Sequence, residues 1–254
     1  MNGLMEQGGI ARVAQAAFIV LVVLLWFGLA RSGGVSPLFL PPIGLVFASL
    51  AALVRTHLFW TALGVTLGTV VRAYLIASAF GVGVAYLVTR SRFCTDLLEP
   101  VIAGFFTIPI TLFFPLFVLF FGIGAQSKVA YAAVYAFFPV AITSIAGFSA
   151  VDSHFVRAAR CMGASAYGVF RRILLPGAMP AIFNGLRIGF FICFASVLGG
   201  ETLASLNGIG RQIAQNAELM ESATMFAWIM VVIAITGAAN LLMSSMERYV
   251  VKRG

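Results

Sequence analysis

Six apolar runs alternate with short polar or basic segments along this chain of 254 residues. They are residues Ala14–Ala30, Ala73–Val88, Val101–Phe121, Val129–Ala150, Phe183–Gly199 and Ala223–Met246. An α-helix needs about 20 apolar residues to cross a bilayer, and these runs approach or exceed that length. The pattern therefore predicts an all-α polytopic membrane protein with six transmembrane helices.

Two of these runs leave a choice open. The first fits either a retained span or a signal peptide, since Gly28 and Ala30 before Arg31 loosely resemble a cleavage site. We expect a retained span, because the later spans need its orientation. The apolar stretch Phe59–Val88 is longer than one span and is interrupted by Arg72. We expect Arg72 near the outer surface, with its side chain extended toward water and the span itself beginning after it.

Composition agrees with a membrane protein and excludes several other classes. Hydrophobic residues make up 61% of the chain and charged residues 9%, too little polar surface to cover a soluble globule. The net charge of +8 comes from residues scattered singly between apolar runs, which is not the pattern of a nucleic-acid-binding surface. The candidate metal ligands Cys94, Cys161, Cys193, His57 and His154 lack any usual zinc spacing.

The basic residues instead set the orientation, because cytoplasmic loops carry an excess of Lys and Arg. With the N-terminus inside, the cytoplasmic set is Arg12, Arg90, Arg92, Arg157, Arg160, Arg171, Arg172, Arg248, Lys252 and Arg253, and the outer set is Arg31, Arg55, Lys128 and Arg211. Both termini and the segment between the fourth and fifth runs are then cytoplasmic. Arg187 and Glu201 lie on one predicted helix about 21 Å apart, which is too far for an ion pair.

The cytoplasmic segment 152–182 is unusually structured for a loop between two spans. Asp152 or Ser153 can cap a first short helix, and Gly163 can end it in the left-handed conformation. Ser165 can cap a second helix, which we expect Pro176 and the following Pro180 to stop.

Both short helices of this segment are predicted to be amphipathic. Phe155, Ala159 and Met162 recur on one face of the first, while Arg157 and Arg160 occupy another. On the second, an apolar stripe of Tyr167, Phe170 and Leu174 accompanies Arg171 and Arg172. Two interpretations follow: a connector lying on anionic lipid, or a docking surface for another protein.

Here the residues carry a family resemblance. Arg157-Ala158-Ala159, Gly163, and then Ile173-Leu174-Leu175-Pro176 resemble the EAA loop of ABC-importer permeases, the cytoplasmic loop that docks on the ATPase subunit. The continuation as far as Gly185-Leu186-Arg187 matches that loop further. Other matches are Leu40-Pro41-Pro42, Phe121-Gly122-Ile123-Gly124, Ser127-Lys128, Phe137-Phe138-Pro139, and Glu201 with Gly208-Ile209-Gly210. These resemble the branch that imports nitrate, taurine, alkanesulfonates, bicarbonate or pyrimidine precursors of thiamine. The resemblance covers about residues 40 to 250.

The resemblance implies the permease subunit of an ATP-driven importer for a small, anionic solute, with the type I importer permease fold. One permease domain, residues 1–254, would carry the coupling loop at 152–182 and would lie in the bacterial plasma (inner) membrane. The residues implied in ATPase coupling are Arg157, Ala158, Ala159, Gly163, Ala164, Ile173, Leu175 and Pro176. Implied partners are two ATPase copies, a second permease copy, an extracytoplasmic binding protein and the bilayer, with no nucleic acid.

The chain itself is not expected to be an enzyme or to bind a cofactor. No G-x-x-x-x-G-K-[ST] phosphate-binding loop precedes Lys128 or Lys252, so ATP and Mg²⁺ are expected on the separate ATPase. A membrane enzyme would need convergent catalytic groups, which the sequence does not suggest. An ATP-independent secondary transporter or channel stays as the alternative, although no internal repeat supports it.

One departure from the family concerns the coupling loop. The family usually has Glu where this chain has Arg157, which reverses the charge at the docking point. Either the ATPase carries a compensating acid, or the Glu is dispensable for the loop. We expect the compensating acid, because like charges across an interface cost affinity.

Candidate residues of the substrate pathway or gate are less specific. They are Thr107, Pro109, Thr111, Phe114, Pro115 and Glu201. Helix packing, an ordinary proline kink or a solvated helix end explains each residue type as readily as a transport role does.

Overall fold

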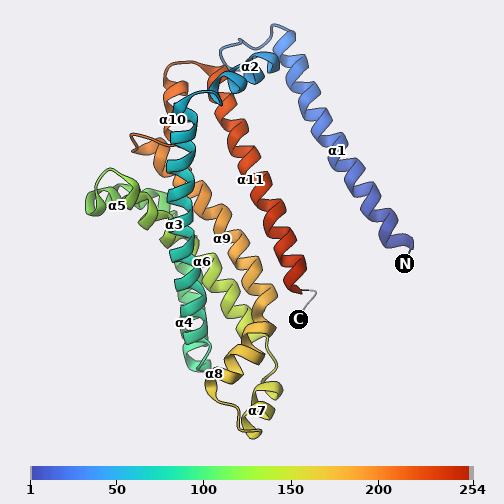
Figure 1. Ribbon diagram of the computed structural model, residues 1–254, viewed down its shortest axis with the longest axis vertical. Helices are drawn as coiled ribbons and strands as arrows, with labels where there is room; N and C mark the ends of the chain where they lie inside the picture. Colours follow the sequence, from blue (N-terminus) through green and yellow to red (C-terminus); the bar gives the residue numbers. More distant parts are fainter. Residues whose placement is uncertain (1, 252–254) are drawn as a thin grey trace. The chain divides into compact units, whose positions relative to one another are not determined.

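The computed structural model describes residues 2–251, and every regular element in that range is helical (Figure 1). It divides into two compact units, residues 1–60 with 212–231 and residues 61–211 with 232–254. The side chains of Arg12 and Arg248, and the residues Lys252 and Arg253, lie outside the described part, so the predicted orientation stays a prediction. The single permease domain likewise stays a prediction.

In the first unit, side-chain contacts hold the loop that follows the first helix. The unit contains α1 (Asn2–Arg31) and α2 (Ile43–Leu53). The indole Nε1 of Trp26 donates to the Pro41 carbonyl at 3.0 Å, and its ring lies 5.1 Å from that of Phe226. The hydroxyl of Ser222 donates to the carbonyl of Leu38. These contacts tie the loop both to the first helix and to the start of the last.

The second unit contains most of the long helices and the segment 152–182. In chain order its elements are α3 (His57–Val88), α4 (Arg92–Thr107), η1 (Ile110–Phe113), α5 (Phe114–Phe121), α6 (Ala125–Ser149), α7 (Ser153–Cys161), α8 (Ala166–Val169), η2 (Phe170–Leu174), α9 (Leu175–Leu203), α10 (Ile209–Glu218) and α11 (Ser222–Val251). Three of them, α3, α10 and α11, also extend into the first unit.

Close packing of α6 against α9 forms the centre of the second unit, and glycines permit it. A Cβ added to Gly189 would lie 2.6 Å from Cγ2 of Val140 and 3.3 Å from the carbonyl of Ala136. On the facing helix, a Cβ at Gly147 would lie 2.7 Å from that of Ala181. Small residues at such contacts let the two backbones approach, which favours dispersion contacts where the surrounding lipid offers no hydrophobic driving force.

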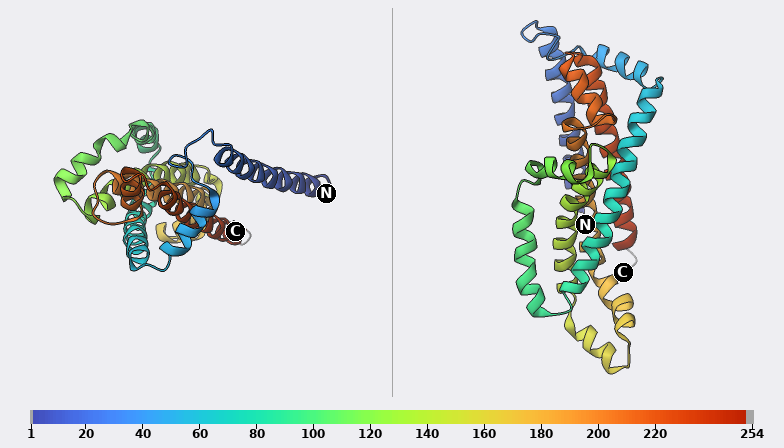
Figure 2. Two further views of the ribbon diagram at one scale, coloured as in Figure 1. Left: turned by 90° about the horizontal axis from the view of Figure 1, so that it is seen from above. Right: turned by 90° about the vertical axis from the view of Figure 1, so that its left-hand side faces the viewer.

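Within the described residues, four helices are long and apolar enough to cross a membrane, and α4 with η1–α5 makes a fifth if a bent pair counts as one span. The predicted run Val101–Phe121 is not one regular helix, because the chain bends by 74° where Pro109 precedes η1. Figure 2 shows α4 running alongside the long helices and the chain then turning across them. The described part of the predicted first span forms a shorter apolar helix, 17–31, so six spans are not established.

The predicted start of the second span was wrong. The helix α3 runs without a break from His57 to Val88, so Arg72 lies at its middle and not at its start. The Arg72 side chain is exposed, and its Nε donates to the carbonyl of Gly68 at 2.9 Å. The apolar residues before Arg72 therefore belong to the same helix as those after it.

The expected stop at Pro176 was also wrong. Phe170–Leu174 form a π-helical turn that leads directly into α9, and helix 166–203 qualifies as one span of 38 residues. Pro176 lies in the first turn of α9, where a missing N–H costs little, and the wider π turn before it relieves the backbone. Pro180 lies inside α9 without ending it.

Candidate functional site: the coupling loop and the outer turn

The segment 152–182, the predicted coupling loop, is built by the local signals that its sequence contains. The Asp152 carboxylate accepts from the backbone N–H of His154 at 2.8 Å and caps α7. The Ser165 hydroxyl accepts from Gly168 N–H at 3.1 Å and caps α8. Gly163, with φ of +82°, makes the left-handed turn between them. These three predictions are confirmed, and together they fix two short helices in a defined hairpin.

Burial separates the coupling candidates into two groups. Ala159 is buried, whereas Arg157 and Ala158 are exposed. The backbone N–H of Ala164 donates to the Ala159 carbonyl at 3.0 Å and closes the turn after Gly163. Ile173 belongs to the π turn, and Leu175 and Pro176 begin α9. The structure thus brings the candidates into one loop, while their role in coupling stays a prediction.

An aromatic cluster attaches this loop to the long helices. The Phe170 ring in the π turn lies 4.4 Å from that of Tyr86 on α3 and 6.3 Å from that of Phe148 on α6. Tyr86 and Phe148 themselves lie 5.9 Å apart. Three elements distant in sequence therefore meet at the base of the loop, where a movement of the loop must displace aromatic packing.

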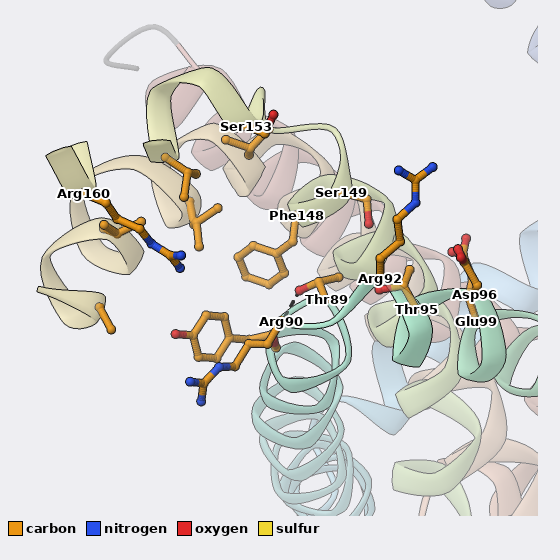
Figure 3. A pocket seen from close by; sticks show the side chains of 16 residues that line it. Thr89, Arg90, Arg92, Thr95, Asp96, Glu99, Phe148, Ser149, Ser153 and Arg160 are labelled. Atoms are coloured by element: carbon orange, nitrogen blue, oxygen red, sulfur yellow. Dashed lines mark hydrogen bonds between the residues drawn. The ribbon is translucent and has the colours of Figure 1, made fainter. Parts of the chain in front are cut away.

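Two clefts flank the loop. The first, about 690 Å³, is lined by residues of α7, by the end of α3 and the turn after it, and by the start of α4. Figure 3 shows Arg160 reaching from α7 toward Phe148, while Asp96 and Glu99 lie together on α4 at the other side. The second cleft, about 830 Å³, is lined by the end of α7, by α8 and by η2, with Arg171 and Arg172 among its residues.

At the opposite end of α9, Glu201 is not the solvated helix end that its position suggested. Its side chain is fully buried, at 0% exposure. The carboxylate accepts from the Thr66 hydroxyl at 2.9 and 3.0 Å and from the backbone N–H of Gly210 at 2.9 Å. Thr66 in turn accepts from Ile209 N–H at 2.9 Å. A buried acid thus satisfies the first turn of α10, where the helix dipole favours negative charge.

Two glycines make room for this carboxylate. Gly208 has φ of +117°, and a Cβ there would fall on the Glu201 carboxyl group. A Cβ on Gly210 would meet the carbonyl of Leu198 and the Cβ of Glu201. The Glu201 and Gly208-Ile209-Gly210 elements of the sequence are therefore one structural unit, in which the glycines admit the acid.

Lys128, which the sequence placed in an outer loop, is also buried. It lies in the first turn of α6 at 2% exposure, and its Nζ donates to the Ser205 hydroxyl at 2.6 Å. That hydroxyl donates to the carbonyl of Asn207 at 2.5 Å. The outer turn 204–208 is thus held on one side by Lys128 and on the other by Glu201.

The remaining pathway candidates do not meet in one place. Thr107 and Thr111 are exposed around the bend, and Pro109 and Pro115 flank η1. Phe114 is buried, with its ring 5.1 Å from that of Tyr131. Its packing matches a core residue, and the role of all five in transport stays a prediction.

Sequence reasoning did not identify Thr66 and did not predict the burial of Lys128. Thr66 is a polar residue in a long apolar run, and its partner Glu201 lies 135 residues further along the chain. Thr61 and Thr69 are further hydroxyl residues of the same run, and Thr69 is as deeply buried as Thr66, so the sequence does not single out Thr66 as a partner of Glu201.

With this geometry established, we compared the chain with known proteins. The family described as binding-protein-dependent transport system inner membrane component matches residues 77–253. The taurine transport system permease protein TauC of Escherichia coli K12 is 30% identical over 235 residues, covering 91% of this chain and 86% of that protein. The putative aliphatic sulfonates transport permease protein SsuC of Bacillus subtilis is 25% identical over 232 residues, covering 91% and 84%.

Solved structures support the fold. A bacterial ABC transporter involved in the import of the acidic polysaccharide alginate superposes with a TM-score of 0.65 at 15% identity, covering 95% of this chain and 97% of that one. An inward-facing MetNI methionine ABC transporter gives 0.62 at 18% identity, covering 75% and 96%. The chain therefore belongs to the family of binding-protein-dependent transport system inner membrane components, as a permease subunit of an ABC importer.

Proposed function

We propose that this permease carries a small sulfonate-like anion inward and that ATP hydrolysis on a separate ATPase subunit drives the transport. The observation that carries the proposal is the 30% identity to the taurine permease across 91% of the chain. The aliphatic sulfonate permease matches over the same share. Taurine and alkanesulfonates each contain a sulfonate group, so the solutes named for the two relatives have the same anionic group.

The proposed assembly contains two copies of this chain, two ATPase subunits that bind ATP and Mg²⁺, and an extracytoplasmic binding protein. Closure of the ATPase pair would move the coupling loops, and the spans would alternate between outward and inward access. The aromatic contacts of Phe170 with Tyr86 and Phe148 support this route, because they join the loop to two long helices.

The solute is best tested on the binding protein of the same transporter. Taurine, an unbranched alkanesulfonate, nitrate and a thiamine-type pyrimidine would each be added, and the thermal shift of the purified binding protein recorded. A ligand at 100 times its Kd stabilises by about 2.7 kcal/mol, which a thermal scan resolves. We expect stabilisation by the sulfonates. Stabilisation by the pyrimidine alone would refute the sulfonate assignment.

Uptake then tests the energy source. Permease and ATPase would be reconstituted in liposomes with the loaded binding protein outside and ATP inside. We expect accumulation that requires all three components and ATP. Uptake that persists without ATP would identify a secondary transporter or channel instead.

A further inference from the structure

Arg72 lies in the middle of a membrane-spanning helix. It is about 22–24 Å from either end of α3 at 1.5 Å per residue. The carbonyl of Val70 accepts from the Cys193 thiol at 3.6 Å. The Tyr74 ring lies 5.5 Å from that of Phe190, so the middle of α3 packs against the middle of α9. Both helices are long and apolar enough to cross a membrane, which places Arg72 at the depth of the hydrocarbon core.

The fold gives this arginine no counter-charge. Its Nε donates to the Gly68 carbonyl at 2.9 Å, one turn away on the same helix. No carboxylate among the described side chains pairs with it, and its terminal nitrogens have no acceptor there. The core of the second unit packs against a different face of α3, that of Val70, Ala73 and Ala77, and the Arg72 side chain is exposed. Its remaining N–H donors are therefore available to a group outside this chain.

Lipid tails do not suit this face of α3. A charge at the centre of the hydrocarbon core is costly. Water lies about 15 Å away, which is half the thickness of the core and farther than an arginine side chain extends. The hydrogen bond to Gly68 also holds the side chain against its own helix. Arg72 therefore borders another protein segment or a water-filled path.

A second copy of this chain does not offer the missing carboxylate. Of the eight acids, seven have described side chains, and Glu6 precedes the first apolar run. Five of the seven lie outside the middle of every span, namely Asp96, Glu99, Asp152, Glu218 and Glu221. The other two, Glu201 and Glu247, already accept hydrogen bonds within the chain. The counter-charge of Arg72 must come from a molecule other than the permease.

Resting on the proposed function, we propose that Arg72 lines the solute path and binds the sulfonate group of the solute in transit. The binding protein and the ATPase stay at the two membrane surfaces, so the anion that reaches this depth is the solute. A guanidinium has a fixed fork of N–H donors that engages two oxygens of an oxyanion, and a sulfonate presents such a pair. One cation binds the sulfonate weakly enough to release it again, which transport requires.

The backbone leaves room for the anion beside Arg72. Gly68 and Gly64 are one and two turns away on the same face of α3. A Cβ on either would meet no atom within 4 Å outside the helix's own backbone. The hydrogen bond to Gly68 turns the guanidinium toward these glycines, and so toward the end of α3 at which Thr66 contacts Glu201. An anion entering from that end passes the open glycine face before it meets the guanidinium.

The first test measures taurine uptake per ATP hydrolysed by the transporter reconstituted in liposomes with its loaded binding protein. We expect Arg72→Gln to lower this ratio by about tenfold or more, because a charge-assisted pair is lost. Arg72→Lys keeps the charge and should retain more uptake than Arg72→Gln. Arg55→Gln makes the same change at an exposed arginine in the turn before α3 and should match the wild type.

Folding of the Arg72→Gln variant is checked separately. Removing a charge from the hydrocarbon core favours insertion, so this variant should be produced at the wild-type level. Its Tm and its elution as an assembled transporter should also match the wild type. A loss of uptake then reports on the solute and not on the fold.

The second test asks whether water reaches position 72. Arg72→Cys is placed in the Cys94→Ala/Cys161→Ala background, which retains only the buried Cys193. The assembled transporter is treated with 2-sulfonatoethyl methanethiosulfonate, a water-soluble reagent that carries the sulfonatoethyl group of taurine. We expect the reagent to modify Arg72→Cys and to leave the background alone unmodified.

Each outcome decides the proposal. Wild-type uptake by folded Arg72→Gln, or equal losses in Arg72→Gln and Arg72→Lys, overturns the sulfonate site and leaves the importer intact. Dissociation of the assembly in Arg72→Gln shows that Arg72 holds protein segments together and also overturns the site. Reaction of Arg72→Cys with membrane-soluble N-phenylmaleimide alone shows that the side chain faces lipid, with the same consequence. A wild-type transporter that moves only a pyrimidine overturns the proposed function as well.

Discussion

The buried Glu201 offers the sharpest energetic test of the structure. Glu201→Ala removes the acceptor of two buried donors, the Thr66 hydroxyl and the Gly210 N–H. A buried donor left without a partner costs about 1–3 kcal/mol, so the loss should be about 2–6 kcal/mol. For a chain of this size, 1 kcal/mol corresponds to about 2–4 °C in Tm, which places the expected drop at about 4 °C or more.

Gly208 sharpens the prediction, because a side chain there would occupy the same space as the carboxylate. Gly208→Ala incurs about 1–2 kcal/mol for its positive φ, and a further steric cost that exists only while Glu201 is present. The double variant should therefore lose less stability than the sum of the single ones. A coupling energy of about 1–3 kcal/mol is typical of residues in contact.

The assay uses the free thiols of the chain. Cys193 is buried, whereas Cys161 is exposed and Cys94 is partly exposed. In a Cys94→Ala/Cys161→Ala background, a thiol-reactive fluorophore therefore reports unfolding through Cys193. Additive losses for Glu201→Ala and Gly208→Ala, or an unchanged Tm for Glu201→Ala, would refute the buried-acid arrangement.

Three further predictions use the same thermal assay or hydrogen exchange. Gly189→Leu should push α6 and α9 apart and lower the free energy of unfolding by about 1–3 kcal/mol through overpacking. Gly199→Ala, whose added Cβ meets open space, should leave it unchanged. Equal effects of the two variants would contradict the close packing. Gly163→Ala should lower the free energy of unfolding by about 1–2 kcal/mol, because Gly163 has a positive φ. Amide hydrogen exchange should become faster in α7 and stay unchanged in α9. Unchanged exchange in α7 would contradict this prediction. Asn240→Ala removes a 2.6 Å hydrogen bond from the Arg187 guanidinium and should cost about 1 kcal/mol in the free energy of unfolding. Glu247→Gln should cost less, because the Arg187–Glu247 ion pair is longer, at 3.4 Å, and its side chains are 35% and 36% exposed; the reverse order would be contrary to the geometry.

Local signals in the sequence were reliable because the partners lie within a few residues. Asp152, Gly163 and Ser165 each act on the adjoining turn, and all three behave as predicted. Glu201 and Lys128 could not be placed in this way. Their contacts come from distant parts of the chain, 135 residues away for Thr66 and 77 for Ser205, and hydropathy alone assigns a charged residue to water.

Helix ends predicted from proline positions were right at some prolines and wrong at others, because the effect of a proline depends on the backbone around it. At Pro109 the chain bends sharply, as the loss of a backbone donor allows. At Pro176 the preceding π turn absorbs the same loss and the helix continues. Sequence identifies the missing N–H, but the surrounding backbone decides whether the helix breaks.

The uninterrupted helix from residue 166 to 203 has a mechanical consequence. At 1.5 Å per residue it is about 57 Å long, so a tilt of about 10° around its middle displaces each end by about 5 Å in opposite directions. One end belongs to the predicted coupling loop and the other carries the buried Glu201. Such a helix acts as a lever, and the five residues of the π turn are the place where its stiffness can change.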